Sequence, residues 1–123
     1  MQKRILVVED EETLRSMLVD SLKEKNYLVE EATNGEIGLD LAVKNSYDLI
    51  LLDIILPKKN GLEVLEDLKK IKKDSLPKVI VLTNLSEADS IQKALDLGAM
   101  SYLVKADYNL REIVMKVKNL LEA

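Results

Sequence analysis

Five polar side chains stand at the carboxyl ends of short apolar runs, and their types together suit phosphoryl chemistry. They are Glu9, Asp10, Asp53, Thr83 and Lys105. Clustered carboxylates raise one another's pKa unless a cation joins them, and hard oxygen ligands suit Mg²⁺. A carboxylate can also attack phosphorus and form an aspartyl phosphate. The hypothesis is that Asp53 accepts a phosphoryl group, whose charge Mg²⁺ and Lys105 hold and whose oxygen accepts a hydrogen bond from Thr83.

Each of these residues also has a structural explanation when it is considered alone. Asp10 could cap a helix, Thr83 is a common strand residue, and Lys105 could be a solvated strand end. Asp53 is harder to explain in this way, because apolar residues directly precede and follow it and a buried, unpaired carboxylate is costly. The phosphoryl hypothesis therefore depends on a fold that gathers the whole set.

The elements that would position these residues alternate between strand and helix along the chain. Runs rich in Val, Ile and Leu, which indicate strands, occur at 4–9, 27–32, 49–53, 79–83 and 101–105. The segments between them repeat apolar residues at helical spacing. Five strands alternating with five helices predict an α/β fold with a parallel sheet.

Such a sheet would bring the candidate residues together. Ligands of open parallel sheets bind beyond the carboxyl ends of the strands, near the point where strand order reverses. Four of the five runs end in a candidate residue, so we expect one shared crevice at that edge. The second run contributes nothing comparable, and its Glu30 and Glu31 predict an edge strand.

Capping residues mark the expected ends of the helices. Asn34, Asn60, Ser86 and Asn109 each precede a segment with helical spacing, and their side chains can accept a hydrogen bond from the first helical turn. Gly98 follows the fourth such segment, where a glycine commonly ends a helix.

The composition excludes several classes of protein. The 123 residues fit one domain, which we expect to span 1–123 with no output domain. A net charge of −4 argues against a nucleic-acid-binding surface. The absence of Cys and His removes disulfides, zinc clusters and the commonest general base. No apolar run reaches the ~18 residues that a membrane span needs, and no signal-peptide pattern is visible, so we expect a cytoplasmic protein without a membrane partner.

Four motifs make the sequence resemble a response-regulator receiver domain of bacterial two-component signalling (CheY-like). They are 5-ILVVEDEE-12, 49-LILLDIILPKKNG-61, 79-VIVLTNLSE-87 and 102-YLVKA-106, and they follow the family's order over the full chain. The resemblance implies a flavodoxin-like (βα)5 fold, in which a doubly wound five-stranded parallel sheet has the strand order 2-1-3-4-5. It implies a signalling switch rather than an enzyme, although one that supports its own phosphotransfer and autodephosphorylation.

The resemblance also implies a role for each site residue. Asp53 matches the phosphoacceptor. Glu9 and Asp10 match the acidic pair that holds Mg²⁺, with Asp53 and the backbone carbonyl of Ile55 as further ligands. Lys105 matches the lysine that contacts the phosphoryl group.

Two further residues match the switch of the family. Thr83 matches the hydroxyl that moves toward the phosphoryl group, and Tyr102 matches the aromatic residue that turns inward behind it. Together they imply that phosphorylation reshapes the face made by the fourth helix, fifth strand and fifth helix, where a downstream protein would dock.

The sequence departs from the family's pattern in ways that concern the site. Glu9 replaces an Asp that is frequent there, and its greater length could route its metal contact through a water. Asn84 stands where a small residue is usual, which could narrow access to the phosphoryl group. Ala106 replaces a proline that commonly follows a cis bond, so the turn after Lys105 is either trans and reshaped or strained.

Other functions stay open on the residues alone. Asn84 and Ala106 would suit a phosphorylation-independent, receiver-like interaction module, whereas the intact acidic set argues against it. A phosphatase of the haloacid-dehalogenase type needs an acid two residues after its nucleophile, where this chain has Ile55. A flavin or dinucleotide module is disfavoured because no glycine-rich loop follows the first strand.

The expected partners follow from the switch hypothesis. The phosphoryl donor would be a sensor histidine kinase or a phosphotransfer protein, because this chain has no histidine. We expect it to meet the first helix, where Val19 lies off the apolar stripe and would be exposed. We expect a monomer, with dimerisation on phosphorylation left open. A run of lysines near the end of the third helix is best explained by its dipole rather than by an anion site: Lys69, Lys70, Lys72 and Lys73.

Overall fold

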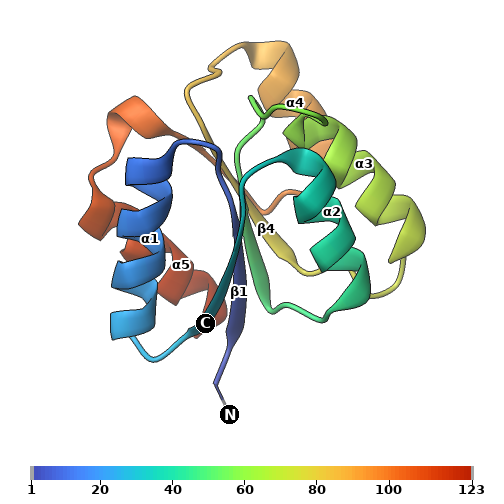
Figure 1. Cartoon of the computed structure of the whole chain (residues 1–123). Coiled ribbons are helices and arrows are strands. Elements are labelled where there is room, and N and C mark those ends of the chain that lie inside the picture. Colours follow the sequence, from blue (N-terminus) through green and yellow to red (C-terminus); the bar gives the residue numbers. More distant parts are fainter. Residues whose placement is uncertain (1, 123) are drawn as a thin grey trace.

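The computed structural model describes residues 2–122, which form one five-stranded parallel sheet between two layers of helices (Figure 1). The strands lie in the order β2-β1-β3-β4-β5, as the resemblance implied. Their bounds are β1 Arg4–Val8, β2 Leu28–Ala32, β3 Leu49–Leu52, β4 Lys78–Thr83 and β5 Ser101–Val104. The helices are α1 Glu12–Glu24, α2 Gly35–Lys44, α3 Gly61–Ile71, α4 Ala88–Asp96 and α5 Leu110–Leu121, with a 3₁₀ helix, η1, at Lys105–Asp107.

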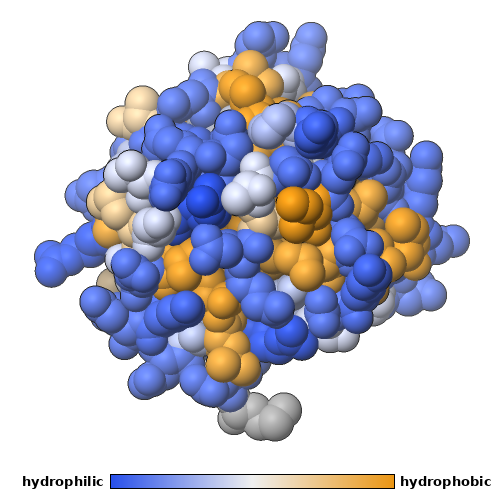
Figure 2. All heavy atoms as spheres, viewed as in Figure 1, coloured by the Kyte–Doolittle hydropathy of each residue, from blue (hydrophilic) through white to orange (hydrophobic). Residues whose placement is uncertain are grey.

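The two faces of the sheet are covered by different helices, which explains why the central strands are apolar throughout. Alternate residues such as Ile5 and Leu51 pack with α1 and α5, whereas Leu6 and Leu52 pack with α2, α3 and α4. Strands that are buried on both faces cannot alternate polar and apolar residues. At about 25 cal/mol for each Å² of apolar surface buried, these two layers dominate the stability of the fold. The face shown in Figure 2 is mostly hydrophilic, with apolar groups set among the polar side chains.

The strand β2 lies at the edge of the sheet, as its two glutamates predicted. Both acidic side chains are exposed and each pairs with an arginine: Glu30 with Arg4 at 2.6 Å and Glu31 with Arg15 at 2.9 Å. Charged side chains on an edge strand discourage pairing with a further strand.

Three of the four predicted N-caps are confirmed. The side chains of Asn34, Asn60 and Asn109 accept hydrogen bonds from the first turns of α2, α3 and α5, and Gly98 ends α4 with a φ of 106°. Ser86 is wrong as a cap, because α4 begins at Ala88 after a residue whose side chain makes no capping bond. A tertiary contact fixes the preceding loop instead, since the Tyr102 hydroxyl binds the carbonyl of Leu85.

The prediction that Val19 is exposed is wrong, because α1 is covered on two sides. The side chain of Val19 is only 4% exposed and belongs to the core between the sheet and α5. Two of the four lysines near the end of α3 bind carbonyls at the ends of other helices. Lys69 donates to the carbonyl of Asp96 at 3.1 Å, and Lys72 donates to that of Asn45 at 2.6 Å. Each amine therefore stabilises the C-terminal end of a neighbouring helix.

Two glycines hold the segment between β3 and α3 against its neighbours. A Cβ on Gly61 would lie 2.2 Å from the carbonyl oxygen of Asp53, and one on Gly35 would lie 1.7 Å from that of Lys59. Only a residue without a side chain permits such close backbone approach. This packing fixes the start of the segment that carries Asp53.

Within residues 2–122, no helix has both the length and the apolar character to cross a bilayer.

Candidate functional site

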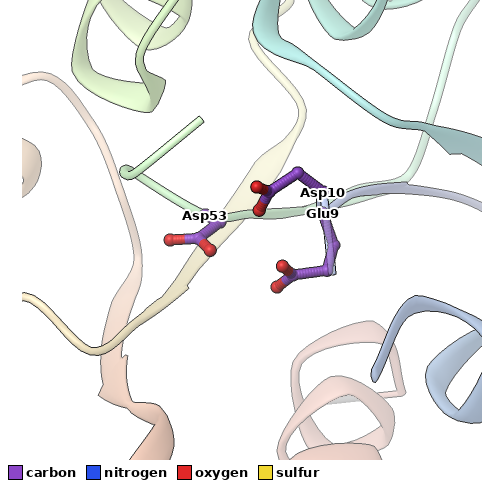
Figure 3. A group of neighbouring side chains, drawn as sticks. All are labelled: Glu9, Asp10 and Asp53. Atoms are coloured by element: carbon purple, nitrogen blue, oxygen red, sulfur yellow. The ribbon is translucent and has the colours of Figure 1, made fainter. Parts of the chain in front are cut away.

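Three carboxylates gather beyond the carboxyl ends of β1 and β3, which are neighbours at the centre of the sheet (Figure 3). Glu9, Asp10 and Asp53 each offer an oxygen, and these three oxygens lie within 4.8 Å of one another. Glu9 and Asp53 are buried, whereas Asp10 is exposed. A set of hard oxygen donors at this spacing, with one side open to water, suits Mg²⁺. The donor set therefore fits the ion that the resemblance implied.

The sheet itself holds the two buried acids. The backbone N–H of Asp53 donates to the carbonyl of Val8 at 3.1 Å, and that of Glu9 donates to Ala32 at 3.1 Å. These bonds extend the ladders of β1, β2 and β3 by one residue beyond the strands. Backbone N–H groups also bind the carboxylates, since Ile55 donates to Asp53 Oδ1 at 3.1 Å.

Lys105 supplies the positive charge of the site. It begins η1 directly after β5, and its Nζ lies 2.8 Å from Glu9 Oε1 and 2.8 Å from Asp53 Oδ2. Burial raises the pKa of Glu9, and hydrogen bonds from Lys105 and Glu11 offset only part of that effect. Burial alone would lower the pKa of Lys105, but hydrogen bonds to the two carboxylates outweigh it and the net direction is upward. The Lys105 ammonium thus pairs with two buried carboxylates, and the cluster keeps an excess of negative charge.

A hollow of about 400 Å³ opens onto this cluster. It is lined by Glu9, Asp10, Glu11, Asp53, Ile55, Asn84 and Lys105. Glu11 was not singled out from the sequence, although its position next to the acidic pair is a signal for it. The Ile55 side chain is 58% exposed at the edge of the hollow. A hollow of this volume, lined by charged and polar side chains apart from Ile55, can admit a phosphoryl group.

Thr83 and Tyr102 are linked through one loop residue. Thr83 ends β4, is fully buried and is not among the residues that line the hollow. Its Oγ1 accepts a hydrogen bond from the N–H of Leu85 at 3.4 Å, and the Tyr102 hydroxyl donates to the carbonyl of the same Leu85. Burial raises the pKa of Tyr102, and the negative charges of Asp53 and Glu87 add to the shift. Both side chains therefore hold the loop that leads from β4 to α4.

The turn after Lys105 is reshaped rather than strained by a cis bond. All peptide bonds of the described residues are trans, and Ala106 lies inside η1. Short 3₁₀ segments are common connectors between longer elements. The structure therefore places the Lys105 amine against the two acids without a proline at position 106.

Comparison with known proteins identifies the family. Residues 5–118 match the family model of the response regulator receiver domain. The response regulator ArlR of Staphylococcus aureus strain Mu50 is 36% identical over 118 residues, which are 96% of this chain and 52% of that protein. ArlR of Staphylococcus saprophyticus matches with the same identity and coverage. The chain thus spans about half the length of these curated relatives.

Solved structures agree with this assignment. A CheY-like receiver domain protein from Methanospirillum hungatei JF-1 has a TM-score of 0.91 at 30% identity, covering 99% of this chain and 95% of that one. The response regulator TrrA of Thermotoga maritima, solved in complex with Mg²⁺ and BeF, has a TM-score of 0.83 at 42% identity, covering 98% and 100% of the two chains. The acidic cluster of Glu9, Asp10 and Asp53 is the kind of magnesium site that receivers carry. By motif, fold and site, this chain belongs to the family of response regulator receiver domains, the signalling modules of two-component systems.

Proposed function

We propose that residues 1–123 form one receiver unit that accepts a phosphoryl group on Asp53 from the phosphohistidine of a partner kinase or phosphotransfer protein. The observation that carries this proposal is the buried Asp53 carboxylate, which lies within reach of two further acids and is bound at 2.8 Å by Lys105. Burying a carboxylate next to two other acids is unfavourable for folding, and such arrangements are typical of functional sites.

Phosphoryl transfer would form one bond to phosphorus and break another. A carboxylate oxygen of Asp53 bonds to phosphorus while the phosphorus–nitrogen bond of the phosphohistidine breaks, and the imidazole leaves with the electron pair. Glu9, Asp10, Asp53 and the carbonyl of Ile55 would hold Mg²⁺, which would neutralise charge on the phosphoryl oxygens. Lys105 already binds Asp53 Oδ2, so its amine needs only a small movement to pair with a phosphoryl oxygen.

The output follows from the contacts of Leu85. A phosphoryl oxygen near Asp53 would attract the Thr83 hydroxyl, which would then leave the N–H of Leu85. Tyr102 binds the carbonyl of the same residue, so the loop before α4 would respond to both side chains. A local change of charge would thereby alter the α4–β5–α5 face, on which a downstream protein would dock.

This switch would act on its own phosphoryl group rather than on external substrates. Ile55 stands two residues after Asp53, where an apolar side chain cannot protonate a leaving group. Loss of the phosphoryl group would occur by water attack at phosphorus, inside a hollow whose rim includes Ile55 and Asn84.

A phosphorylation-independent interaction module is the alternative that one observation favours. Asn84 lines the hollow, so its side chain takes up space beside the acceptor. The two functions differ in whether Asp53 reacts at all.

The decisive experiment is the intact mass of the protein after incubation with acetyl phosphate, with Mg²⁺ or with EDTA. We expect the wild type to gain one phosphoryl group only with Mg²⁺, and the variant Asp53→Asn to gain none. The variant Asp40→Asn is the matched control, because Asp40 lies exposed on α2 and should leave the gain unchanged. A wild type that neither gains mass from acetyl phosphate or a phosphorylated kinase nor binds Mg²⁺ would support the phosphorylation-independent module.

A further inference from the structure

One arginine outside the hollow, Arg15, forms hydrogen bonds that connect three segments around the acidic pair Glu9 and Asp10. Arg15 lies in the first part of α1, and its side chain is only 13% exposed. Its Nε donates to Glu31 Oε1 on β2 at 2.9 Å. Its Nη1 donates to the carbonyl of Glu9 at 3.1 Å and, at a longer 3.4 Å, to that of Asp10. A planar guanidinium can make such bonds in two directions at once, which a lysine cannot.

Besides the bonds of Arg15, the turn between β1 and α1 is held by the N–H of Glu11, which donates to Glu9 Oε2 at 3.0 Å. Its N-cap residue, Glu11, makes no side-chain capping bond. Glu9 is held by the sheet and by Lys105, but the structure gives the exposed Asp10 carboxylate no hydrogen-bond partner among the described residues. The direction of the Asp10 side chain therefore depends on the peptide groups that Arg15 binds.

We propose that Arg15 is a positioning residue for the metal site, with Glu31 as its anchor on the edge strand. This inference rests on the proposed function. By binding the carbonyls of Glu9 and Asp10, the guanidinium fixes the backbone of the turn and keeps the two carboxylates directed toward Asp53. Ligands that are already ordered lose less conformational freedom when the ion binds. The protein therefore binds Mg²⁺ more tightly than it would without the contacts of Arg15.

The charge of Arg15 and its positioning role predict opposite changes in Mg²⁺ affinity when the guanidinium is removed. The direction of the change therefore tests the inference. Arg15 is a cation close to an acidic pair, so its charge repels Mg²⁺. If charge were its only influence, removal of the guanidinium would tighten Mg²⁺ binding. If Arg15 positions the turn, its removal weakens binding in spite of the charge.

The test is calorimetric titration of Mg²⁺ into the wild type and into Arg15→Met, which keeps an unbranched apolar side chain of similar length. We expect the dissociation constant for Mg²⁺ to rise about tenfold, the lower end of the range for groups that orient metal ligands. Phosphorylation by acetyl phosphate should slow at limiting Mg²⁺ and return to the wild-type rate at saturating Mg²⁺.

Arg4→Met is the matched control. Arg4 also joins β1 to a glutamate of β2, at 2.6 Å from Glu30, but it lies at the opposite end of the sheet from the acidic pair. This variant loses an ion pair of the same kind and should bind Mg²⁺ as the wild type does. Arg15→Lys should fall between the wild type and Arg15→Met, because an ammonium reaches either Glu31 or the carbonyls but does not bridge them.

The outcomes separate the two proposals. A dissociation constant in Arg15→Met that equals or falls below that of the wild type would overturn the positioning role. If Arg15→Met does not fold, Arg15→Lys and Glu31→Gln decide in the same way, since both retain most of the packing. A wild type that binds no Mg²⁺ would overturn the proposed metal site and this inference with it, whereas tight binding that is insensitive to Arg15 would overturn the inference alone.

Discussion

Charged groups are arranged differently at the two ends of the sheet. At the amino ends of the strands, several polar groups have partners of their own: Arg4 pairs with Glu30, Lys78 donates to the carbonyl of Leu120, and Tyr27 donates to Glu122. At the carboxyl ends, the carboxylates of Glu9, Asp10 and Asp53 converge, and Lys105 is the ammonium that binds two of them.

This difference separates groups that stabilise the fold from groups that are arranged for a ligand. Partnered charges at the amino ends close the structure and need nothing further. Converging acids with too little positive charge disfavour the folded state until a cation arrives. The electrostatic repulsion of the folded state is therefore concentrated at the carboxyl ends of the strands, where a bound cation such as Mg²⁺ would offset it.

The largest expected effect comes from removing the ammonium that the converging acids share. Lys105→Met leaves Glu9 and Asp53 buried without a cation. We expect a loss of about 1–3 kcal/mol in the free energy of unfolding, because the open hollow admits water and reduces the cost of a fully buried unpaired charge. Phosphorylation by acetyl phosphate should slow by about 10²–10³-fold.

Urea unfolding with and without Mg²⁺ checks this prediction. Mg²⁺ should stabilise Lys105→Met more than it stabilises the wild type, because it supplies the missing positive charge. Lys44→Met, which loses an exposed pair with Asp40 on α2, is the control and should change neither stability nor phosphorylation measurably. An equal response of both variants to Mg²⁺ would contradict the shared role of Lys105.

A smaller effect is expected from displacing the acceptor without changing any charge. In Gly61→Ala the new Cβ would lie 2.2 Å from the carbonyl of Asp53, so the β3–α3 segment must shift. We expect a loss of about 1–3 kcal/mol in stability and a slowing of phosphorylation by up to about 10²-fold. Denaturant unfolding and the rate of mass gain measure the two effects separately.

Gly98→Ala distinguishes displacement from a general loss of stability. Gly98 has a φ of 106°, so alanine there is strained, but the residue lies at the end of α4 and near Leu76 rather than near Asp53. This variant should lose a comparable amount of stability and keep the wild-type rate of phosphorylation. If both variants slowed equally, the close approach of Gly61 to Asp53 would have no special importance.

Much of the fold and of the acidic cluster could be predicted because both follow from local patterns. Apolar runs covered on two faces mark parallel strands, and parallel strands bring their last residues to one edge. That rule alone is enough to place Glu9, Asp10, Asp53 and Lys105 together at one edge of the sheet. The polar end of β4 is harder to predict, because strand position alone does not say which of two adjacent residues faces a hollow: Thr83 is buried, and its neighbour Asn84 lines the hollow.

The features that the sequence did not predict all depend on contacts between distant segments. An arginine on a helix is usually solvated, so nothing local indicates that Arg15 reaches both β2 and the turn after β1. Val19 lies off the main apolar stripe of α1 and is buried only because α5 covers a second side of that helix. Ser86 has the right type for a cap but lies in a loop that Tyr102 holds through Leu85.

The smallest expected effect tests the amino end of the sheet, where Tyr27 donates to Glu122 Oε2 at 2.6 Å. Tyr27→Phe should lose about 1 kcal/mol of stability near neutral pH and leave phosphorylation unchanged, because one hydrogen bond is removed far from the hollow. Burial, followed by the hydrogen bond to Glu122, raises the pKa of Tyr27 from 10.0 to about 12. Between these two values the unfolded chain releases the phenol proton and the folded protein keeps it, so a rise in pH favours unfolding of the wild type but not of the variant. The stability difference between the two proteins, measured by urea unfolding, should therefore hold below about pH 10 and shrink above it; a constant difference to about pH 11 would contradict the partnered state of this tyrosine.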